Sequence, residues 1–190
     1  MTSVGALFVV TGPSGAGKGT LIRELLARRP ELEVAVSATT RQRRPGEIDG
    51  QDYHFMAEDE FVQAKRAGTF YEEVEYVSGH RYGTLEREVS RILGTGRSCV
   101  LEVETQGARA VKSRESSAVT IFIASPTFEE LERRLTERAT ESAGEIGERL
   151  ALARCQMDEA PDFDFVVVND SIERAAEELV AIVGRETKTG

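Results

Sequence analysis

Residues 12–20 read Gly12-Pro13-Ser14-Gly15-Ala16-Gly17-Lys18-Gly19-Thr20. This glycine-rich stretch follows the apolar run Leu7-Phe8-Val9-Val10 and precedes apolar residues at helical spacing: Leu21, Ile22, Leu25 and Leu26. A strand, a glycine-rich turn and a helix in this order predict a phosphate-binding P-loop, because converging backbone N–H groups and a helix N-terminus favour an anion. Lys18 is then expected to contact the β- and γ-phosphates of a nucleoside triphosphate. The alternative is a turn that only connects a strand to a helix.

The composition is that of one soluble globular domain. The chain has 190 residues, of which 40% are hydrophobic and 30% charged, and this length allows a sizeable core. No apolar run reaches the length of a membrane span, and the N-terminus lacks the basic start of a signal peptide. Two cysteines, Cys99 and Cys155, make no disulfide framework and favour a reducing cytoplasm. The net charge of −9 argues against a nucleic-acid polymer as partner.

The periodicity predicts strands that alternate with helices. After the P-loop helix, which Pro30 ends, strands are predicted at 32–36, 70–77, 98–103, 119–124 and 165–168. Further helices are predicted at 58–67, 85–93, 128–138, from 148 to about 160, and at 172–183, with a frayed tail at 186–190. This order indicates an α/β fold with a central parallel sheet flanked by helices. Ligands in such folds bind at the carboxyl ends of the strands.

Residues 37–84 break this alternation with short strands around one helix, and residues 79–84 are read as a turn. We interpret the segment as a lobe that holds the acceptor substrate. Arg41 and Arg44, with Tyr53 nearby in sequence, offer two guanidinium forks and a phenol, which suit a phosphate group. The alternative is a solvated basic turn, the usual fate of such a run. The two histidines, His54 and His80, are read as loop residues rather than catalysts.

The lobe also carries residue types that suit guanine. Guanine presents a donor edge beside the acceptor O6, so that a carboxylate such as Glu72 and a hydroxyl such as Ser37 or Thr84 would complement it. Adenine would place an acceptor against the glutamate and leave it unpaired. The alternative for Glu72 is an exposed acid on an edge strand.

Arginines in the later part of the chain suit phosphoryl transfer, which needs positioning and charge neutralisation. Arg134 and Arg138 are four residues apart and therefore share a helix face, and Arg149 follows the polar segment 139–147. We expect this region to form a lid that excludes water. The alternative is a solvated helix whose arginines pair with Glu130 and Glu137.

Two further pairs of polar residues lie at predicted strand ends. Glu102 and Glu104 alternate on one strand and are expected to face the same side, where they would hold water on magnesium or touch the acceptor; solvated strand ends are the alternative. Asn169 and Asp170 follow the last predicted strand. They would edge the ATP base or cap the next helix.

The sequence resembles the guanylate kinase family from the P-loop to Asn169-Asp170. The most specific part, Ser37-x-Thr39-Thr40-Arg41-x-x-Arg44-x-Gly46-Glu47-x-x-Gly50-x-x-Tyr53-x-Phe55, is similar to the family's GMP-binding signature. The resemblance implies transfer of the γ-phosphate of ATP to GMP, and also to dGMP, with Mg²⁺ held through ATP and water and no direct protein ligand. It implies a core (1–36, 85–126 and 161–190), a GMP-binding lobe (37–84) and a lid (about 127–160).

The same resemblance implies roles for individual residues. The ATP-binding set is Gly12, Pro13, Ser14, Gly15, Ala16, Gly17, Lys18, Gly19, Thr20 and Asn169. The GMP-binding set is Ser37, Arg41, Arg44, Tyr53, Glu72, Tyr82, Thr84 and Glu104. The catalytic set is Lys18, Arg41, Arg134, Arg138 and Arg149.

The chain departs from the family pattern at several positions. Gly19 stands where general P-loops carry Ser or Thr, a variant familiar among small nucleotide kinases. Glu102 and Glu104 replace two aspartates, and Arg81 replaces a common tyrosine. Ser78 resembles a one-residue insertion, which leaves Glu73 as an alternative to Glu72 for the guanine ligand. Two other functions stay open: an enzyme for another phosphorylated acceptor, and a non-catalytic scaffold module, which the intact Gly17-Lys18 disfavours.

Overall fold

The computed structural model describes residues 5–76, 79–137 and 143–189. Its core is a five-stranded parallel sheet in the order β2-β7-β1-β8-β9. The strands are β1 (Leu7–Thr11), β2 (Leu32–Val34), β7 (Ser98–Glu102), β8 (Val119–Ala124) and β9 (Phe165–Val168). The predicted parallel sheet is confirmed, with β1 in the centre and the P-loop directly after its carboxyl end.

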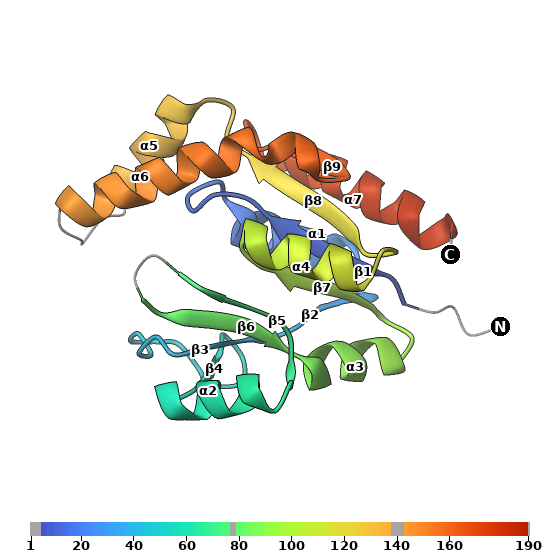
Figure 1. Ribbon diagram of the computed structural model, residues 1–190. Coiled ribbons are helices and arrows are strands. Elements are labelled where there is room, and N and C mark those ends of the chain that lie inside the picture. The colour runs from blue at the N-terminus through green and yellow to red at the C-terminus, as the bar shows by residue number, and fades with distance from the viewer. Residues whose placement is uncertain (1–4, 77–78, 138–142, 190) are drawn as a thin grey trace.

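Helices cover both faces of this sheet, as Figure 1 shows. Phe8 and Val10 of β1 pack into one core with α1 (Lys18–Arg28) and α7 (Ile172–Thr189). Leu7 and Val9 of the same strand pack into a second core with α3 (Glu86–Gly94) and α4 (Thr105–Arg114). Because alternate residues of a strand point to opposite faces, a strand buried on both faces reads as a continuous apolar run, as residues 7–10 of the fully buried β1 do.

The predicted small-sheet insertion is also confirmed. Its order is β4-β3-β6-β5, with β3 and β4 parallel and the other neighbours antiparallel. The strands are β3 (Ser37–Thr39), β4 (His54–Phe55), β5 (Phe70–Glu75) and β6 (Arg81–Leu85). One face is closed by α2 (Glu58–Arg66), whose buried Phe61 packs with Ala38 and Leu85. The other face is therefore left for a ligand.

Two helices, α5 (Phe128–Glu137) and α6 (Ala143–Asp158), followed by a 3₁₀ turn at Ala160–Asp162, form the region expected to be a lid. In Figure 1, α6 and the small sheet lie on opposite sides of the carboxyl ends of the main strands. Within the described ranges, no helix is long and apolar enough to cross a membrane.

Four expectations about elements were wrong. Helix α4 was not predicted, because its sequence TQGARAVKSR contains a glycine and offers few apolar side chains to define a period. The expected turn ending at Thr84 is strand β6, held by pairing with β3 and β5. Helix α6 begins at Ala143 rather than after Gly147, and α7 continues to Thr189 instead of ending at Val183.

Candidate active site

The P-loop is built by glycines with positive φ. Gly12, Gly15 and Gly17 have φ values of 134°, 86° and 92°, a region that side-chain-bearing residues rarely adopt. Lys18 opens α1, and its Nζ donates hydrogen bonds to the carbonyl oxygens of Gly12 at 2.7 Å and Pro13 at 3.2 Å. The ammonium group therefore lies over the loop itself, at the N-terminus of the helix.

Asn169 braces this loop from the end of β9. Its side chain is buried, and Nδ2 donates to the carbonyl oxygen of Ala16 at 2.7 Å. A Cβ atom on Gly17 would lie 2.3 Å from the same Nδ2, so the glycine is required by space as well as by φ. Sequence reasoning had considered Asn169 as an edge for the ATP base or a helix cap, and it missed this contact with the loop.

Most of the residues expected to bind the acceptor line one cavity of about 780 Å³, which we call the larger cleft. Ser14 and Lys18 of the P-loop form one side of it. The small sheet and its loops contribute the expected acceptor residues Ser37, Arg41, Arg44, Tyr53, Glu72 and Tyr82. Glu102 and Glu104 from the main sheet and Arg149 from α6 also line it. The fold thus brings together side chains that are far apart in sequence.

Three polar residues form a row across the small sheet. Thr84 on β6 is in register with Ser37 on β3 and with Glu72 on β5. Residues in register on neighbouring strands share a face, so all three lie on the face that α2 leaves open. Thr84 Oγ1 donates to Glu72 Oε1 at 2.8 Å. Ser37 and Glu72 line the larger cleft, while the buried Thr84 supports the carboxylate from within the row.

Glu72 is an unusually buried carboxylate, only 6% exposed. Burial raises the pKa of Glu72 to about 7, the charges of Glu73 and Glu104 act in the same direction, and the hydrogen bond from Thr84 opposes the shift. Helix α4 approaches closely, because a Cβ atom on Gly107 would lie 2.6 Å from Glu72 Oε2. A larger residue at position 107 would therefore displace the Glu72 carboxylate.

Glu73 lies on the opposite face of the strand and pairs with Lys65 of α2 at 2.5 Å. Its carboxylate is thus directed toward the helix that covers the sheet, whereas Glu72 lines the larger cleft. Of the two glutamates left open by the sequence, the geometry favours Glu72. Ser78, the residue that raised the question, lies outside the described residues.

Arg41 is held in place by Glu47, a residue to which the sequence analysis assigned no separate role. Glu47 accepts two hydrogen bonds from its guanidinium group, at 3.1 Å and 2.7 Å, and the guanidinium carbon lies 5.4 Å from the centre of the Tyr53 ring. Glu47 also accepts from the backbone N–H of Arg44 at 2.7 Å. Burial, together with the charge of Glu102, raises the pKa of Tyr53 to about 12, so the phenol stays a hydrogen-bond donor at neutral pH.

Glu102 and Glu104 both face the larger cleft, as their alternation predicted. Glu102 lies near the start of α1, where a Cβ atom on Gly19 would be 3.8 Å from Glu102 Oε2. Glu104 Oε2 accepts a hydrogen bond of 2.8 Å from Nε2 of Gln156 on α6. Gln156 was not identified from the sequence. The signal was available, because Gln156 is a polar residue on the helix face that Ala153 and Met157 bury.

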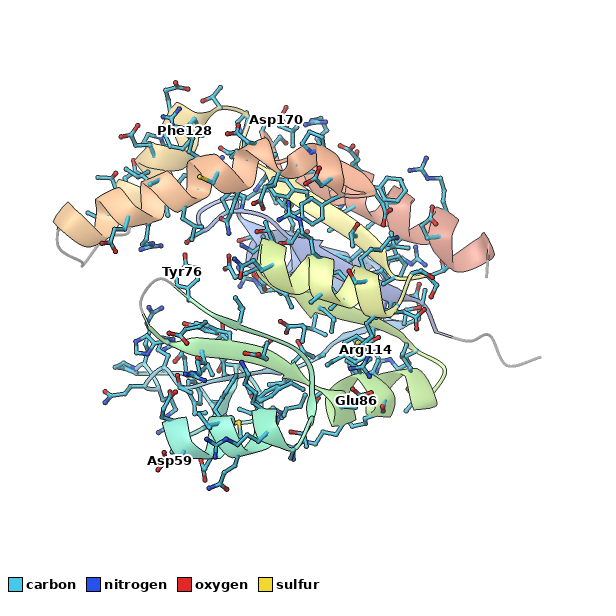
Figure 2. All side chains as sticks on the ribbon, viewed as in Figure 1. Asp59, Tyr76, Glu86, Arg114, Phe128 and Asp170 are labelled. Atoms are coloured by element: carbon cyan, nitrogen blue, oxygen red, sulfur yellow. The ribbon has the colours of Figure 1, made fainter. Side chains whose placement is uncertain are left out.

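Arg149 connects α6 to the P-loop. Its Nη2 donates to Ser14 Oγ at 2.8 Å. It also lies beside the phenol of Tyr76, a second missed residue, which points from the small sheet toward α6 in Figure 2. Burial and then the charge of Glu104 raise the pKa of Tyr76 to about 12, while Arg149 opposes the shift.

A smaller cleft of about 710 Å³ lies on the other side of the P-loop. It is lined by Gly15, Gly17, Thr20, Arg134, Asn169 and Asp170, among others. Arg134 donates to Glu130 Oε1 at 2.9 Å and to the carbonyl oxygen of Asn169 at 3.4 Å. It therefore lines the smaller cleft and also forms the ion pair with Glu130 that was considered as the alternative. Arg138, the third expected arginine, lies outside the described residues.

The histidines and the acidic residues give no protein-ligated metal centre in the described part of the chain, where no cluster of three or more His, Cys, Asp or Glu is suited to a cation. His54 pairs with Glu88 of α3 at 3.3 Å. His80 is one of the residues that line the larger cleft.

A P-loop at the carboxyl edge of a parallel sheet, with one cleft on each side of it, defines the class of P-loop phosphotransferases. Two substrates can meet across such a loop: one at the smaller cleft and one at the polar row of the larger cleft.

Comparison with known proteins points to one family. A family model described as guanylate kinase matches residues 5–186. The guanylate kinase of Rubrobacter xylanophilus is 49% identical over 181 residues, which are 95% of this chain and 94% of the relative. That of Bifidobacterium longum is 43% identical over 189 residues, or 97% and 96% of the two chains. The crystal structure of the Anaplasma phagocytophilum guanylate kinase superposes with a TM-score of 0.79 at 30% identity, covering 97% of this chain and 87% of that one.

These matches span nearly the whole chain, and the structural match agrees with the architecture. The chain belongs to the guanylate kinase family.

Proposed function

We propose how this chain, as a guanylate kinase, transfers the γ-phosphate of ATP to GMP and releases ADP and GDP. The observation that carries the proposal is the row Ser37, Thr84 and Glu72, because Ser37 and Glu72 of this row line the same cleft as Lys18. One cleft thus offers the Glu72 carboxylate and the Ser37 hydroxyl for a base, and the Lys18 ammonium group for a phosphate. A scaffold role would not require this combination.

ATP binds at the P-loop with its base toward the smaller cleft. The backbone N–H groups of residues 12–20 surround the β- and γ-phosphates. Lys18 exchanges its contacts with Gly12 and Pro13 for phosphate oxygens. Asn169 keeps the loop in shape through Ala16. Arg134 lies at the cleft and neutralises charge that develops on the transferred group.

GMP binds in the larger cleft. The ionised Glu72 accepts hydrogen bonds from the donor edge of guanine, the hydroxyl of Ser37 donates to O6, and Thr84 keeps the carboxylate in place. Glu104, which also lines the larger cleft, provides a second carboxylate for GMP. Arg41, Arg44, Tyr53 and Tyr82 hold the phosphate of GMP. Arg41 is pre-oriented by Glu47, because a fixed guanidinium fork loses little freedom when it binds phosphate.

The acceptor oxygen already carries negative charge near neutral pH, so the reaction needs no side-chain base. The chain's task is to align the two phosphates and to neutralise charge. Arg149, which contacts Ser14 from α6, lies between donor and acceptor. We assign α5 and α6 as the lid over about 127–160, residues 37–84 as the GMP-binding lobe and the remainder as the core.

Magnesium fits the groups at the start of α1. Bound with ATP, the ion would neutralise the β- and γ-phosphates. Glu102 lies near Gly19, and carboxylate and hydroxyl oxygens are the partners that Mg²⁺ prefers. Glu102 and the Thr20 hydroxyl would hold water around the ion rather than bind it directly. We place the reaction in the cytoplasm, since Cys99 and Cys155 are both free thiols.

The test is product formation with ATP and Mg²⁺ and one acceptor at a time: GMP, dGMP, AMP, UMP or CMP. Turnover is expected with GMP, to a lesser degree with dGMP, and not with the other three. The Lys18→Ala variant should lose turnover by at least 100-fold. Equal turnover with AMP and GMP, or turnover with none of the five by folded protein, would refute the proposal.

A further inference from the structure

One face of α6 contacts both sides of the active site. Arg149 and Gln156 are seven residues, or two helical turns, apart and therefore share a face. Arg149 donates to Ser14 of the P-loop at 2.8 Å. Gln156 donates to Glu104 at 2.8 Å. The helix thus links the ATP-binding loop to a carboxylate of the larger cleft.

The contact made by Gln156 is a buried one. Gln156 is only 4% exposed, and a buried amide that lacks a partner is costly. Its Nε2 meets Oε2 of Glu104, a residue that lines the larger cleft and directly precedes the first turn of α4. The hydrogen bond is charge-assisted, and such bonds are about twice as strong as neutral ones.

We propose that Gln156 is a positioning residue for the acceptor nucleotide, acting through Glu104. This inference rests on the proposed function. A glutamate side chain has three rotatable bonds, and ordering it costs conformational entropy. By fixing Oε2, Gln156 orders Glu104 before GMP arrives, which is the usual benefit of preorganisation.

The chemistry of an amide suits this role better than a charged partner would. Gln156 donates an N–H without cancelling the negative charge of Glu104, which stays available to accept hydrogen bonds from guanine. An arginine or lysine in its place would neutralise that charge. A carboxylate would face Glu104 with like charge and no donor.

The experiment measures KM for GMP and for ATP in Gln156→Met, Glu104→Ala and the double variant. Methionine keeps the length and volume of glutamine and removes the N–H donor. Gln156→Met is expected to raise KM for GMP about 10-fold, with KM for ATP changed less than 2-fold. In the Glu104→Ala background the same change should have little further effect, because the partner is already absent. Gln63→Met, at an exposed position of α2, is the matched control.

A second variant keeps the test decisive if Gln156→Met does not fold. Gln156→Glu retains shape but opposes the charge of Glu104, and it should raise KM for GMP at least as much. The inference is overturned if the wild type turns over GMP normally while both Gln156 variants leave its KM unchanged. It is also overturned if the effects of Gln156→Met and Glu104→Ala multiply independently. A wild type without GMP turnover would refute the proposed function, and this inference with it.

Discussion

Glu72 illustrates at the scale of one residue how burial and recognition are combined. Its carboxylate is enclosed by the small sheet and α4, accepts from Thr84 and faces the larger cleft. A charged group in this position is poorly solvated and gains strongly from a ligand that donates hydrogen bonds. The same carboxylate therefore destabilises the empty protein and stabilises the complex.

The first prediction compares Glu72→Gln with Glu73→Gln. The amide at position 72 would present N–H groups to the donor edge of guanine, so kcat/KM for GMP should fall on the order of 100-fold or more. Glu73 pairs with Lys65 on the far face, and its variant should stay within about 3-fold of the wild type. Steady-state kinetics with varied GMP decides; a larger loss for Glu73→Gln would reassign the guanine ligand.

The second prediction concerns stability and pH. The pKa of Glu72 is raised from 4.5 to about 7 in the folded protein, so folding favours its protonated form. The resulting stability is fully present below pH 4.5 and is lost as the pH rises through 7. The free energy of unfolding of Glu72→Gln, relative to that of the wild type, should therefore rise by about 2–3 kcal/mol from pH 5 to pH 8. Urea unfolding of both proteins at the two pH values measures this gain, and a difference independent of pH would contradict it.

At the scale of elements, the P-loop depends on β9 as much as on its own glycines. Gly17 combines a φ of 92° with the close approach of Asn169. The third prediction is that Gly17→Ala abolishes detectable ATP binding, because the new Cβ must displace either the loop or Asn169. Calorimetric titration of ATP provides the measurement.

The matched control for this substitution is Gly68→Ala. Gly68 has a φ of 66°, and a Cβ atom there meets nothing within 4 Å. Gly68→Ala therefore introduces the same kind of backbone strain, about 1 kcal/mol, but no clash like the one between position 17 and Asn169. Gly68→Ala should lower stability slightly and leave ATP binding intact. If both variants bind ATP equally well, the contact with Asn169 does not matter.

Arg114 of α4 contacts both the small sheet and α3. Arg114 lies 4.1 Å from the centre of the Tyr71 ring and pairs with Glu86 of α3 at 2.7 Å; Arg114 and Glu86 lie side by side in Figure 2. The fourth prediction is that Arg114→Ala lowers the free energy of unfolding by about 1 kcal/mol, while Arg66→Ala, at an exposed site on α2, changes it by less than about 0.5 kcal/mol. Urea unfolding tests both, and equal effects would contradict the assigned contact.

For the whole molecule, the sequence predicts the parts whose signal is local. The P-loop, the buried strands and the separate small sheet follow from glycine spacing, apolar runs and a break in alternation. The row of Ser37, Thr84 and Glu72 was also predicted as a set of residue types. Their alignment could not be predicted, because it depends on the register of β3, β5 and β6.

What the sequence did not reveal depends on contacts between distant segments. Helix α4 has few apolar residues and is held by the sheet and by the close packing of Gly107 against Glu72. Gln156 and Tyr76 gain their roles only because α6 crosses the larger cleft. Asn169 was considered for the base of ATP, yet its amide is directed to the P-loop backbone.

The measurement that tests the central claim most directly is the titration of GMP and of ATP, separately, into the wild type, Lys18→Ala and Glu72→Gln. The account predicts that Glu72→Gln loses GMP binding and keeps ATP binding, whereas Lys18→Ala loses affinity for ATP and keeps GMP. These opposite patterns would place the two nucleotides at the two sides of the P-loop. If Glu72→Gln bound GMP as tightly as the wild type, the claim that the row on the small sheet reads guanine would be wrong.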